Sequence, residues 1–255
     1  MKLFDAHCHL QDDRLFADLE NIVARAGKSG VEKMICAGTS PADWNRVLEC
    51  AQRFPHNIIP ALGIHPWFVE GGTRPPGALQ TLENLLIQNP AAAIGETGLD
   101  FQKRFTNREA QEKSFIAHLQ LAGKLNRPVV VHCVHAWGRL FEIIKENPAP
   151  NILLHAYSGA TELIPELAAL NCCFSFNAGI INLHAKRVRA AIAAVPEHRL
   201  LLETDAPDFT PPGKTPPNEP ANLNLILRVA AELRNQSESS LAEITFRNTA
   251  EFFKF

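Results

Sequence analysis

The sequence lacks several features that would place it in a special class of protein. No uninterrupted apolar run is long enough to cross a membrane, and the amino terminus has neither the basic nor the long apolar segment of a signal peptide. The 25 Lys and Arg residues are offset by 27 Asp and Glu residues, a formal net charge of −2. No overall basic field therefore attracts nucleic acid. We expect a cytoplasmic protein without membrane contact, which would hold any phosphate substrate by local charges or metal ions.

The cysteines also lack a pattern of their own. None of the six forms a C-x-x-C pair, and four lie in apolar, strand-like runs, which is typical of reduced, buried thiols. Cys8 and Cys133 adjoin candidate metal ligands. Side chains alternate along a strand, so Cys8 should face away from His7 and His9, and Cys133 away from His132. We therefore assign both thiols to the core.

The chain does contain a regular alternation of structural patterns. Its 255 residues, 46% of them apolar, suit one large barrel or two smaller domains. Eight short apolar runs alternate with helical patterns, which indicates parallel βαβ units. An open doubly wound sheet is the alternative, but no Gly-rich phosphate fingerprint follows the first run. No linker or fixed-period repeat is visible. The sequence predicts a single (β/α)8 TIM barrel over residues 1–255, with its site at the carboxyl ends of the strands.

The predicted strands are nearly continuous apolar runs, as expected of strands buried on both faces. They are Lys2–His7, Val31–Ala37, Asn57–Gly63, Ala92–Glu96, Pro128–Cys133, Asn151–His155, Cys172–Asn177 and Arg199–Thr204. The predicted helices, which follow the helical apolar period, are Asp13–Lys28, Pro41–Phe54, Gly77–Gln88, Asn107–Leu125, Trp137–Glu146, Thr161–Leu170, His184–Val195, Pro220–Arg234 and Leu241–Phe253. The Pro-rich segment Pro207–Pro220 is interpreted as a semi-rigid loop at the site, with a plain surface loop as the alternative.

Ligand-type residues stand at the ends of five predicted strands. They are His7 and His9 in the first, Glu96 in the fourth, His132 in the fifth, His155 in the sixth and Asp205 in the eighth. Barrel closure would gather them on one rim, and buried carboxylates need partners, so the pattern predicts a metal site. Six ligands are too many for one zinc ion, whereas six with one shared carboxylate serve two ions and suit phosphoester hydrolysis. Zn, Mn, Co and Mg all remain open.

Five segments in order resemble the TatD-like metal-dependent hydrolases of the amidohydrolase superfamily. These segments are Asp5-Ala6-His7-Cys8-His9, Gly63-Ile64-His65-Pro66, Gly95-Glu96-Thr97-Gly98-Leu99-Asp100, His155-Ala156-Tyr157-Ser158-Gly159 and Leu202-Glu203-Thr204-Asp205-Ala206-Pro207. The resemblance implies a metal-dependent deoxyribonuclease with 3′→5′ exonuclease action on single-stranded DNA.

The resemblance also implies roles for individual residues. It assigns one ion to His7, His9, Glu96 and Asp205, and a second ion to Glu96, His132 and His155. Glu96 then bridges the two ions, in the place that a modified lysine takes elsewhere in the superfamily. Asp205 doubles as the general base for the attacking water. His65 contacts the scissile phosphate.

The chain departs from the family pattern in its fifth strand. The family commonly has an arginine where this chain has Val134, on the same strand face as His132, so a cation near the substrate or near Glu203 is missing. We interpret Glu203 as a residue that orients a ligand or the loop Asn218-Glu219-Pro220; a buried glutamate paired with a neighbour is the alternative.

Some residues near the predicted rim could contact a nucleic acid. Lys103, Arg104 and Arg108 follow the fourth strand and are expected to meet backbone phosphates. Trp67 follows His65 and either stacks on a base or packs within its loop.

Three functions remain open at this point. A two-metal phosphodiesterase acting on DNA is favoured. An amidase, lactonase or small-ester hydrolase of the same superfamily is the second, and Val134 in place of arginine supports it. A non-catalytic metal- or partner-binding barrel is the third, although Glu96 and Asp205 argue against it because purely structural sites are normally closed and cysteine-rich. We expect a monomer that needs no protein partner.

Overall fold

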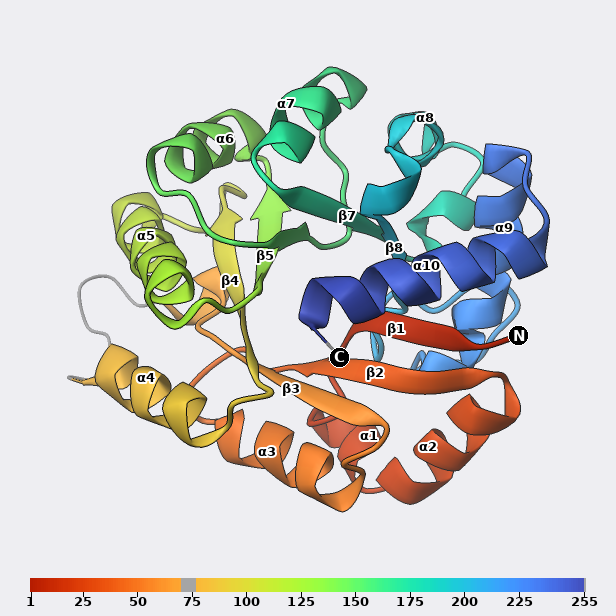
Figure 1. Cartoon of the computed structure of the whole chain (residues 1–255), viewed down its shortest axis with the longest axis horizontal. Helices are drawn as coiled ribbons and strands as arrows, with labels where there is room; N and C mark the ends of the chain where they lie inside the picture. Colours follow the sequence, from red (N-terminus) through yellow and green to blue (C-terminus); the bar gives the residue numbers. More distant parts are fainter. Residues whose placement is uncertain (70–76, 255) are drawn as a thin grey trace.

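The centre of the structure is a parallel sheet whose strands are neighbours in chain order. A computed structural model describes residues 1–69 and 77–254 (Figure 1). Its eight strands follow one another around the sheet, each paired in parallel with the next. They are β1 (Leu3–Cys8), β2 (Val31–Ala37), β3 (Ile58–Leu62), β4 (Ala93–Asp100), β5 (Val129–Val134), β6 (Ile152–Leu154), β7 (Cys172–Phe176) and β8 (Leu200–Leu202). The predicted (β/α)8 barrel is confirmed.

Helices alternate with these strands and surround them (Figure 1). They are α1 (Asp13–Phe16), α2 (Leu19–Lys28), α3 (Trp44–Arg53), α4 (Ala78–Gln88), α5 (Arg108–Leu125), α6 (Trp137–Glu146), α7 (Ile164–Ala169), α8 (Lys186–Ala194), α9 (Leu223–Arg234) and α10 (Glu238–Phe253). Short 3₁₀ turns η1 (Pro66–Phe68), η2 (Thr161–Leu163), η3 (Ala178–Ile181), η4 (Glu197–Arg199) and η5 (Pro220–Asn222) connect some of them. No helix in these described parts of the chain is both long and apolar enough to cross a membrane.

Several predicted boundaries differ from the structure where polar side chains act on the backbone. The helix predicted over Asp13–Lys28 is divided into α1 and α2. Asp12 caps α1 by accepting a hydrogen bond from the Arg14 N–H (2.9 Å), and Asp18 stands immediately before α2. Aspartate favours helix ends because its side chain competes for nearby backbone groups. At the other end of the chain, a Ser237 cap starts α10 three residues before the predicted position.

The strands around the predicted site also differ in length from the prediction. β4 was expected to end at Glu96 but continues to Asp100, so Glu96 lies inside a strand. β8 ends at Leu202, which places Asp205 in the segment after it. The carboxyl ends of the strands still share one edge of the barrel, as in every parallel sheet.

Residues beyond β8 close the barrel against β1. The Asp205 N–H donates to the His7 carbonyl (2.9 Å), and the His9 N–H donates to the Ala206 carbonyl (2.6 Å). Within the structure as described, the contact between β1 and the segment after β8 is thus made, at the carboxyl end, by the backbone of candidate site residues. Placing these side chains and closing the barrel depend on the same contacts.

The amino-terminal half of the barrel interior is filled by apolar side chains. They include Phe4, Ala6, Ile35, Ala37, Ile59, Ala61, Ala93, Val130, Leu153, Cys173 and Leu201, together with Phe252 and Phe253. Phe252 and Phe253 come from α10, which lies across β1 and β8 (Figure 1). Phe253 stacks on Phe4 with ring centroids 6.4 Å apart. Burial of this surface stabilises the fold at about 25 cal/mol per Å².

Candidate metal centre

Every residue assigned to the site from the sequence lies at the carboxyl end of the barrel. The structure brings together His7 and His9 from the end of β1, His65 after β3, Glu96 in β4, His132 in β5, His155 after β6 and Asp205 after β8. Five of these seven side chains are buried, and His9 and His132 are partly buried. Such a concentration of buried imidazoles and carboxylates needs internal compensation of charge.

An irregularity in β1 turns both histidines inward. Ala6 belongs to the barrel interior, and an ideal strand would turn the next residue outward. The pairing of β1 with β2 is irregular between Asp5 and Cys8, and His7 also faces the interior, where it contacts Glu96. A bulge re-aims side chains in this way. Cys8 then points outward into the core between strands and helices, as predicted.

Glycines allow β4 to present Glu96. Pairing with β5 shifts between Ile94 and Thr97, and Gly95 and Gly98 adopt φ values of 130° and 135°, which residues with a side chain rarely adopt. A Cβ atom on Gly95 would lie 2.6 Å from the Val130 carbonyl oxygen, and one on Gly98 would overlap the His132 backbone. The Gly-Glu-Thr-Gly sequence is therefore required to bring the carboxylate against β5.

One oxygen of Glu96 belongs to a first group of donors. Its Oε2 lies 3.4 Å from His7 Nε2 and 3.5 Å from His9 Nε2. Asp205 Oδ1 completes the group at 3.7 Å and 3.6 Å from the same two nitrogens. The two imidazole nitrogens are 3.1 Å apart. Four donor atoms thus surround one small volume.

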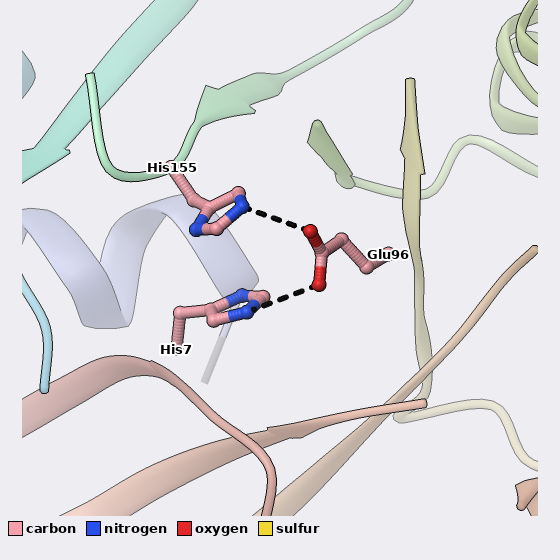
Figure 2. Close-up of side chains that lie close together, drawn as sticks. All are labelled: His7, Glu96 and His155. Atoms are coloured by element: carbon pink, nitrogen blue, oxygen red, sulfur yellow. Dashed lines mark ion pairs between the residues drawn. The ribbon is translucent and has the colours of Figure 1, made fainter. Parts of the chain in front are cut away.

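The other oxygen of Glu96 faces a second group. Its Oε1 lies 2.9 Å from His155 Nε2, 3.0 Å from His132 Nδ1 and 3.2 Å from His65 Nε2. Figure 2 shows His7 and His155 pointing at opposite oxygens of the carboxylate. Glu96 therefore stands between two sets of nitrogen and oxygen donors.

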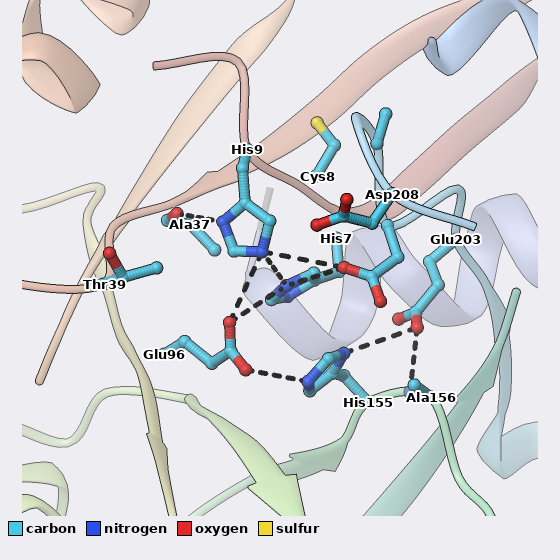
Figure 3. A network of polar contacts seen from close by, with 12 residues as sticks. His7, Cys8, His9, Ala37, Thr39, Glu96, His155, Ala156, Glu203 and Asp208 are labelled. Atoms are coloured by element: carbon cyan, nitrogen blue, oxygen red, sulfur yellow. Dashed lines mark hydrogen bonds and ion pairs between the residues drawn. The ribbon is translucent and has the colours of Figure 1, made fainter. Parts of the chain in front are cut away.

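Hydrogen bonds determine which ring nitrogens are available. His9 Nδ1 lies 2.7 Å from the Ala37 carbonyl (Figure 3). A carbonyl only accepts, so this nitrogen carries the proton, and the Nε2 lone pair is left for a metal. His65 is the opposite case, because its Nδ1 accepts the Trp67 backbone N–H (3.1 Å). The neutral ring of His65 therefore carries its proton on Nε2, facing Glu96.

The charges of the site shift its pKa values. Burial acts to raise the pKa of Glu96, but the charge of His155, with hydrogen bonds from His132 and His155, holds it well below its usual range. Burial likewise opposes the charge on His9, yet its bond to Asp205 and the charge of Glu96 raise its pKa to about 9. Burial lowers the pKa of His65 to about 4. Without a metal, protons bound to histidines balance the carboxylates.

Glu203 contacts the ring nitrogen of His155 that does not face Glu96. Its Oε1 lies 3.5 Å from His155 Nδ1 and accepts the Ala156 N–H at 2.8 Å (Figure 3). This position orients the imidazole, in accordance with one of the two roles expected from the sequence. The loop that was the other expected contact is held differently, since the Asn218 amide donates to the Thr204 carbonyl (3.0 Å).

Some supporting residues were missed in the sequence. Asp5 is fully buried, accepts from the His7 N–H (3.3 Å) and the Thr204 N–H (2.9 Å), and thereby ties β1 to the segment before Asp205. Burial raises its pKa to about 8. His118 of α5 accepts the Ile64 N–H (3.2 Å) and so holds the segment next to His65. Asp5 lies within a recognised motif, but nothing in the helical pattern distinguishes His118.

The site's donor atoms fit divalent metal ions. Imidazole nitrogens and carboxylate oxygens from several strands lie within 4.8 Å of one another in overlapping sets of three residues, such as His7, His9 and Asp205 or His65, Glu96 and His132. Such mixed ligands suit Zn, Mn or Co. The two oxygens of Glu96 separate the donors into two groups. The arrangement can therefore hold metal ions beside an ionised carboxylate and a neutral imidazole, which together can activate water and bind an anion.

Comparison with known proteins agrees with this chemistry. A family model described as TatD related DNase matches residues 4–254. The chain is 30% identical over 260 residues to the 3′-5′ ssDNA/RNA exonuclease TatD of Edwardsiella piscicida, with 99% of each chain covered. It is 29% identical over 263 residues to the human deoxyribonuclease TATDN3, covering 98% of this chain and 94% of that one. The structure of the TatD homologue YJJV from Escherichia coli matches with a TM-score of 0.93, 30% identity and coverage of 99% and 98%.

Proposed function

The chain belongs to the TatD family of metal-dependent hydrolases, and we propose that it hydrolyses single-stranded DNA from the 3′ end. The observation that carries this proposal is the position of Glu96, with one carboxylate oxygen against each of two donor groups. A carboxylate shared between two donor groups would suit a pair of metal ions, and paired metal ions are a common device for phosphodiester cleavage. The names of the relatives support DNA as the substrate.

We assign the donor groups to two divalent ions. The first ion would be held by His7, His9, Glu96 and Asp205, and the second by Glu96, His132 and His155. When bound, such ions polarise the phosphodiester, make water a better nucleophile and stabilise the leaving oxygen. The protein contributes the largely buried setting that keeps the donors in place.

We assign Asp205 the role of accepting a proton from the attacking water. Its pKa is held below the usual range because the bonds and charges of His9, His155 and His7 outweigh burial, so the carboxylate is ionised at neutral pH. The Asn177 amide donates to its Oδ2 (3.4 Å) and orients the group. A positioned general base contributes roughly 10²- to 10⁴-fold to rate.

We assign His65 the role of binding the substrate. Its pKa of about 4 keeps the ring neutral, and its Nε2 proton points into the site because Nδ1 accepts from Trp67. A neutral N–H donor can bind a phosphate oxygen while leaving the metals to the other histidines.

The decisive experiment compares wild type with Asp205→Asn on single-stranded oligonucleotides labelled at the 3′ or the 5′ end, with Mg, Mn, Co or Zn. We expect metal-dependent release of nucleotides from the 3′ end, reduced by roughly 10²- to 10⁴-fold in the variant. Equal activity of wild type and variant would refute the assigned role of Asp205. Absence of cleavage by the metal-loaded wild type would refute the nuclease.

A second candidate is hydrolysis of an amide, lactone or small ester. Val134 favours it, because this uncharged side chain lines the cavity beside His132, where an arginine would assist a phosphate. Metal-dependent turnover of such substrates, with no cleavage of oligonucleotides, would establish this alternative.

We also propose that the protein acts as a monomer, since all seven candidate side chains come from one chain. Sedimentation at assay concentration tests this proposal, and activity confined to a dimer would contradict it.

A further inference from the structure

The exposed aromatic side chains are concentrated at the mouth of the site. Among the residues that the structure describes, Trp67, Phe68 and Phe209 are the exposed aromatics, with 48%, 50% and 52% of their surface accessible. Trp67 and Phe68 follow β3, and Phe209 follows β8. Leaving aromatic surface in water is unfavourable, and aromatics with one free face are typical of stacking sites for nucleic-acid bases.

Trp67 is held rigidly despite its exposure. Its indole N–H donates to Asp100 Oδ2 at 2.6 Å, and Asp100 is fully buried with the same oxygen 3.7 Å from His132 Nε2. The Trp67 ring also meets the His65 ring edge-on, with centroids 4.8 Å apart. A ring fixed in this way loses little entropy when a ligand stacks on it, and it lies directly beside candidate metal ligands.

The positively charged side chain of Arg104 lies against the Trp67 ring. The Arg104 guanidinium lies over the rings of Trp67 and Phe105, 4.9 Å and 4.7 Å from their centroids. The Phe105 ring stacks on one side of Trp67, with the two ring centroids 6.2 Å apart. Arg104 and the adjacent Lys103 are exposed, and within residues 1–69 and 77–254 neither takes part in an ion pair. An exposed cation next to an aromatic surface suits the phosphate attached to a stacked base.

The opposite sector of the rim has an apolar cavity. It measures about 290 Å³ and lies against His132, His155 and Asp205. Its remaining walls are uncharged and include Val134, Phe176, Val188 and Phe209. The volume is just below the roughly 300–1,000 Å³ of small-molecule pockets. It suits one flat, uncharged group such as a base better than a second phosphate.

We propose that the protein binds its substrate by stacking two bases, one on Trp67 and one against Phe209 in the cavity, with the cleaved bond between them. This inference rests on the proposed nuclease function and specifies how the substrate is recognised. Bases within a duplex stack on one another, so only a single strand can present both faces. Every base has such a face, so binding tolerates different sequences.

The test uses four dinucleotides: one complete, one abasic on the 5′ side, one abasic on the 3′ side and one abasic on both. For each, kcat/KM is measured with wild type, Trp67→Gln, Trp67→Phe, Phe209→Ala and Ile87→Ala. Glutamine keeps an N–H for Asp100 but has no ring, whereas phenylalanine keeps the ring. Ile87 is an exposed apolar residue at the far end of α4 and serves as the matched control.

We expect removal of either base to lower the kcat/KM of wild type by roughly 5- to 100-fold. Trp67→Gln should show the same loss on the complete dinucleotide. It should show no further loss when the base that stacks on Trp67 is removed, whichever of the two bases that is. The kcat/KM of Phe209→Ala should not fall further when the other base is removed. Trp67→Phe and Ile87→Ala should retain both dependences.

Two results would overturn the inference. One is a wild type that cleaves complete and abasic dinucleotides equally. The other is a Trp67→Gln or Phe209→Ala variant that loses the same factor on every substrate, which is the signature of a damaged fold or metal site. Cleavage of the doubly abasic dinucleotide by wild type would show that the nuclease function stands even if base stacking fails. No cleavage of any of the four would refute that function itself.

Discussion

The two halves of the barrel interior have opposite chemistry although the same strands build both. On β5, Val130 belongs to the apolar interior and His132, two residues later on the same face, contacts Glu96. On β6 and the residue that follows it, the pair is Leu153 and His155. In both pairs, a shift of two residues along the chain thus leads from an apolar side chain of the core to a side chain of the candidate site.

The physical reason for this division lies in the cost of burying charge. Apolar side chains in the amino-terminal half gain free energy from burial. The imidazoles and carboxylates in the other half would lose several kcal/mol each if buried without partners. They are gathered where they neutralise one another and where metal ions can enter. Stability and activity should therefore respond to different substitutions.

The largest expected effect is on the chemistry of the carboxyl-terminal half. Glu96→Gln removes the charge shared by both donor groups, and we expect kcat to fall on the order of 10³-fold or more. The number of tightly bound metal ions, measured by elemental analysis after dialysis, should fall as well. Glu251→Gln, which alters an exposed carboxylate of α10, should change neither quantity. Full metal content in Glu96→Gln would contradict the bridging assignment.

A substitution in the amino-terminal half should have the reverse effect. Leu153→Ala creates a cavity two residues before His155, and we expect the free energy of unfolding to fall by about 2–5 kcal/mol. Metal content and kcat of the folded protein should be retained, because the truncated side chain belongs to the apolar cluster and supplies no donor atom. Urea denaturation and activity at low temperature measure the two effects. A loss of metal at unchanged stability would show that the halves are not independent.

The smallest effect concerns protons and metal. Because the pKa of His9 is raised from 6.5 to about 9, its proton stabilises the metal-free protein below pH 6.5, and this contribution is lost as pH rises through 9. A metal must displace that proton, so metal affinity should rise over the same window.

The melting temperature, recorded with metal and with chelator from pH 6 to 9, tests this coupling. The difference in melting temperature between the two conditions should widen as pH increases. The corresponding free energy of stabilisation by the metal is about 2.7 kcal/mol when the metal is at 100 times its Kd. A difference that stays constant over this range would contradict proton–metal competition at His9.

Much of the fold was accessible from local patterns. The strand predicted over Val31–Ala37 has the observed bounds, as does the helix over Trp137–Glu146. Apolar runs of strand length and amphipathic helices are encoded by neighbouring residues. The convergence of the candidate ligands could also be anticipated, because parallel strands in a closed barrel must end on one rim.

What could not be predicted depends on contacts between distant parts of the chain. The irregularity in β1 that turns His7 inward depends on its pairing with β2. Asp5 acquires its role only by meeting Thr204, which is 199 residues away. Trp67 becomes a rigid platform only through Asp100.

By itself, the sequence determined the barrel, the order of its elements and the residue types available for chemistry, because periodicity and composition are local properties. Only the tertiary structure decided which carboxylate oxygen of Glu96 meets which histidine, which ring nitrogens carry protons and which aromatics stay exposed beside the site. Those outcomes depend on register, on bulges and on the closure of β8 against β1. Each is set by hydrogen bonds and packing between segments that the sequence pattern treats as independent.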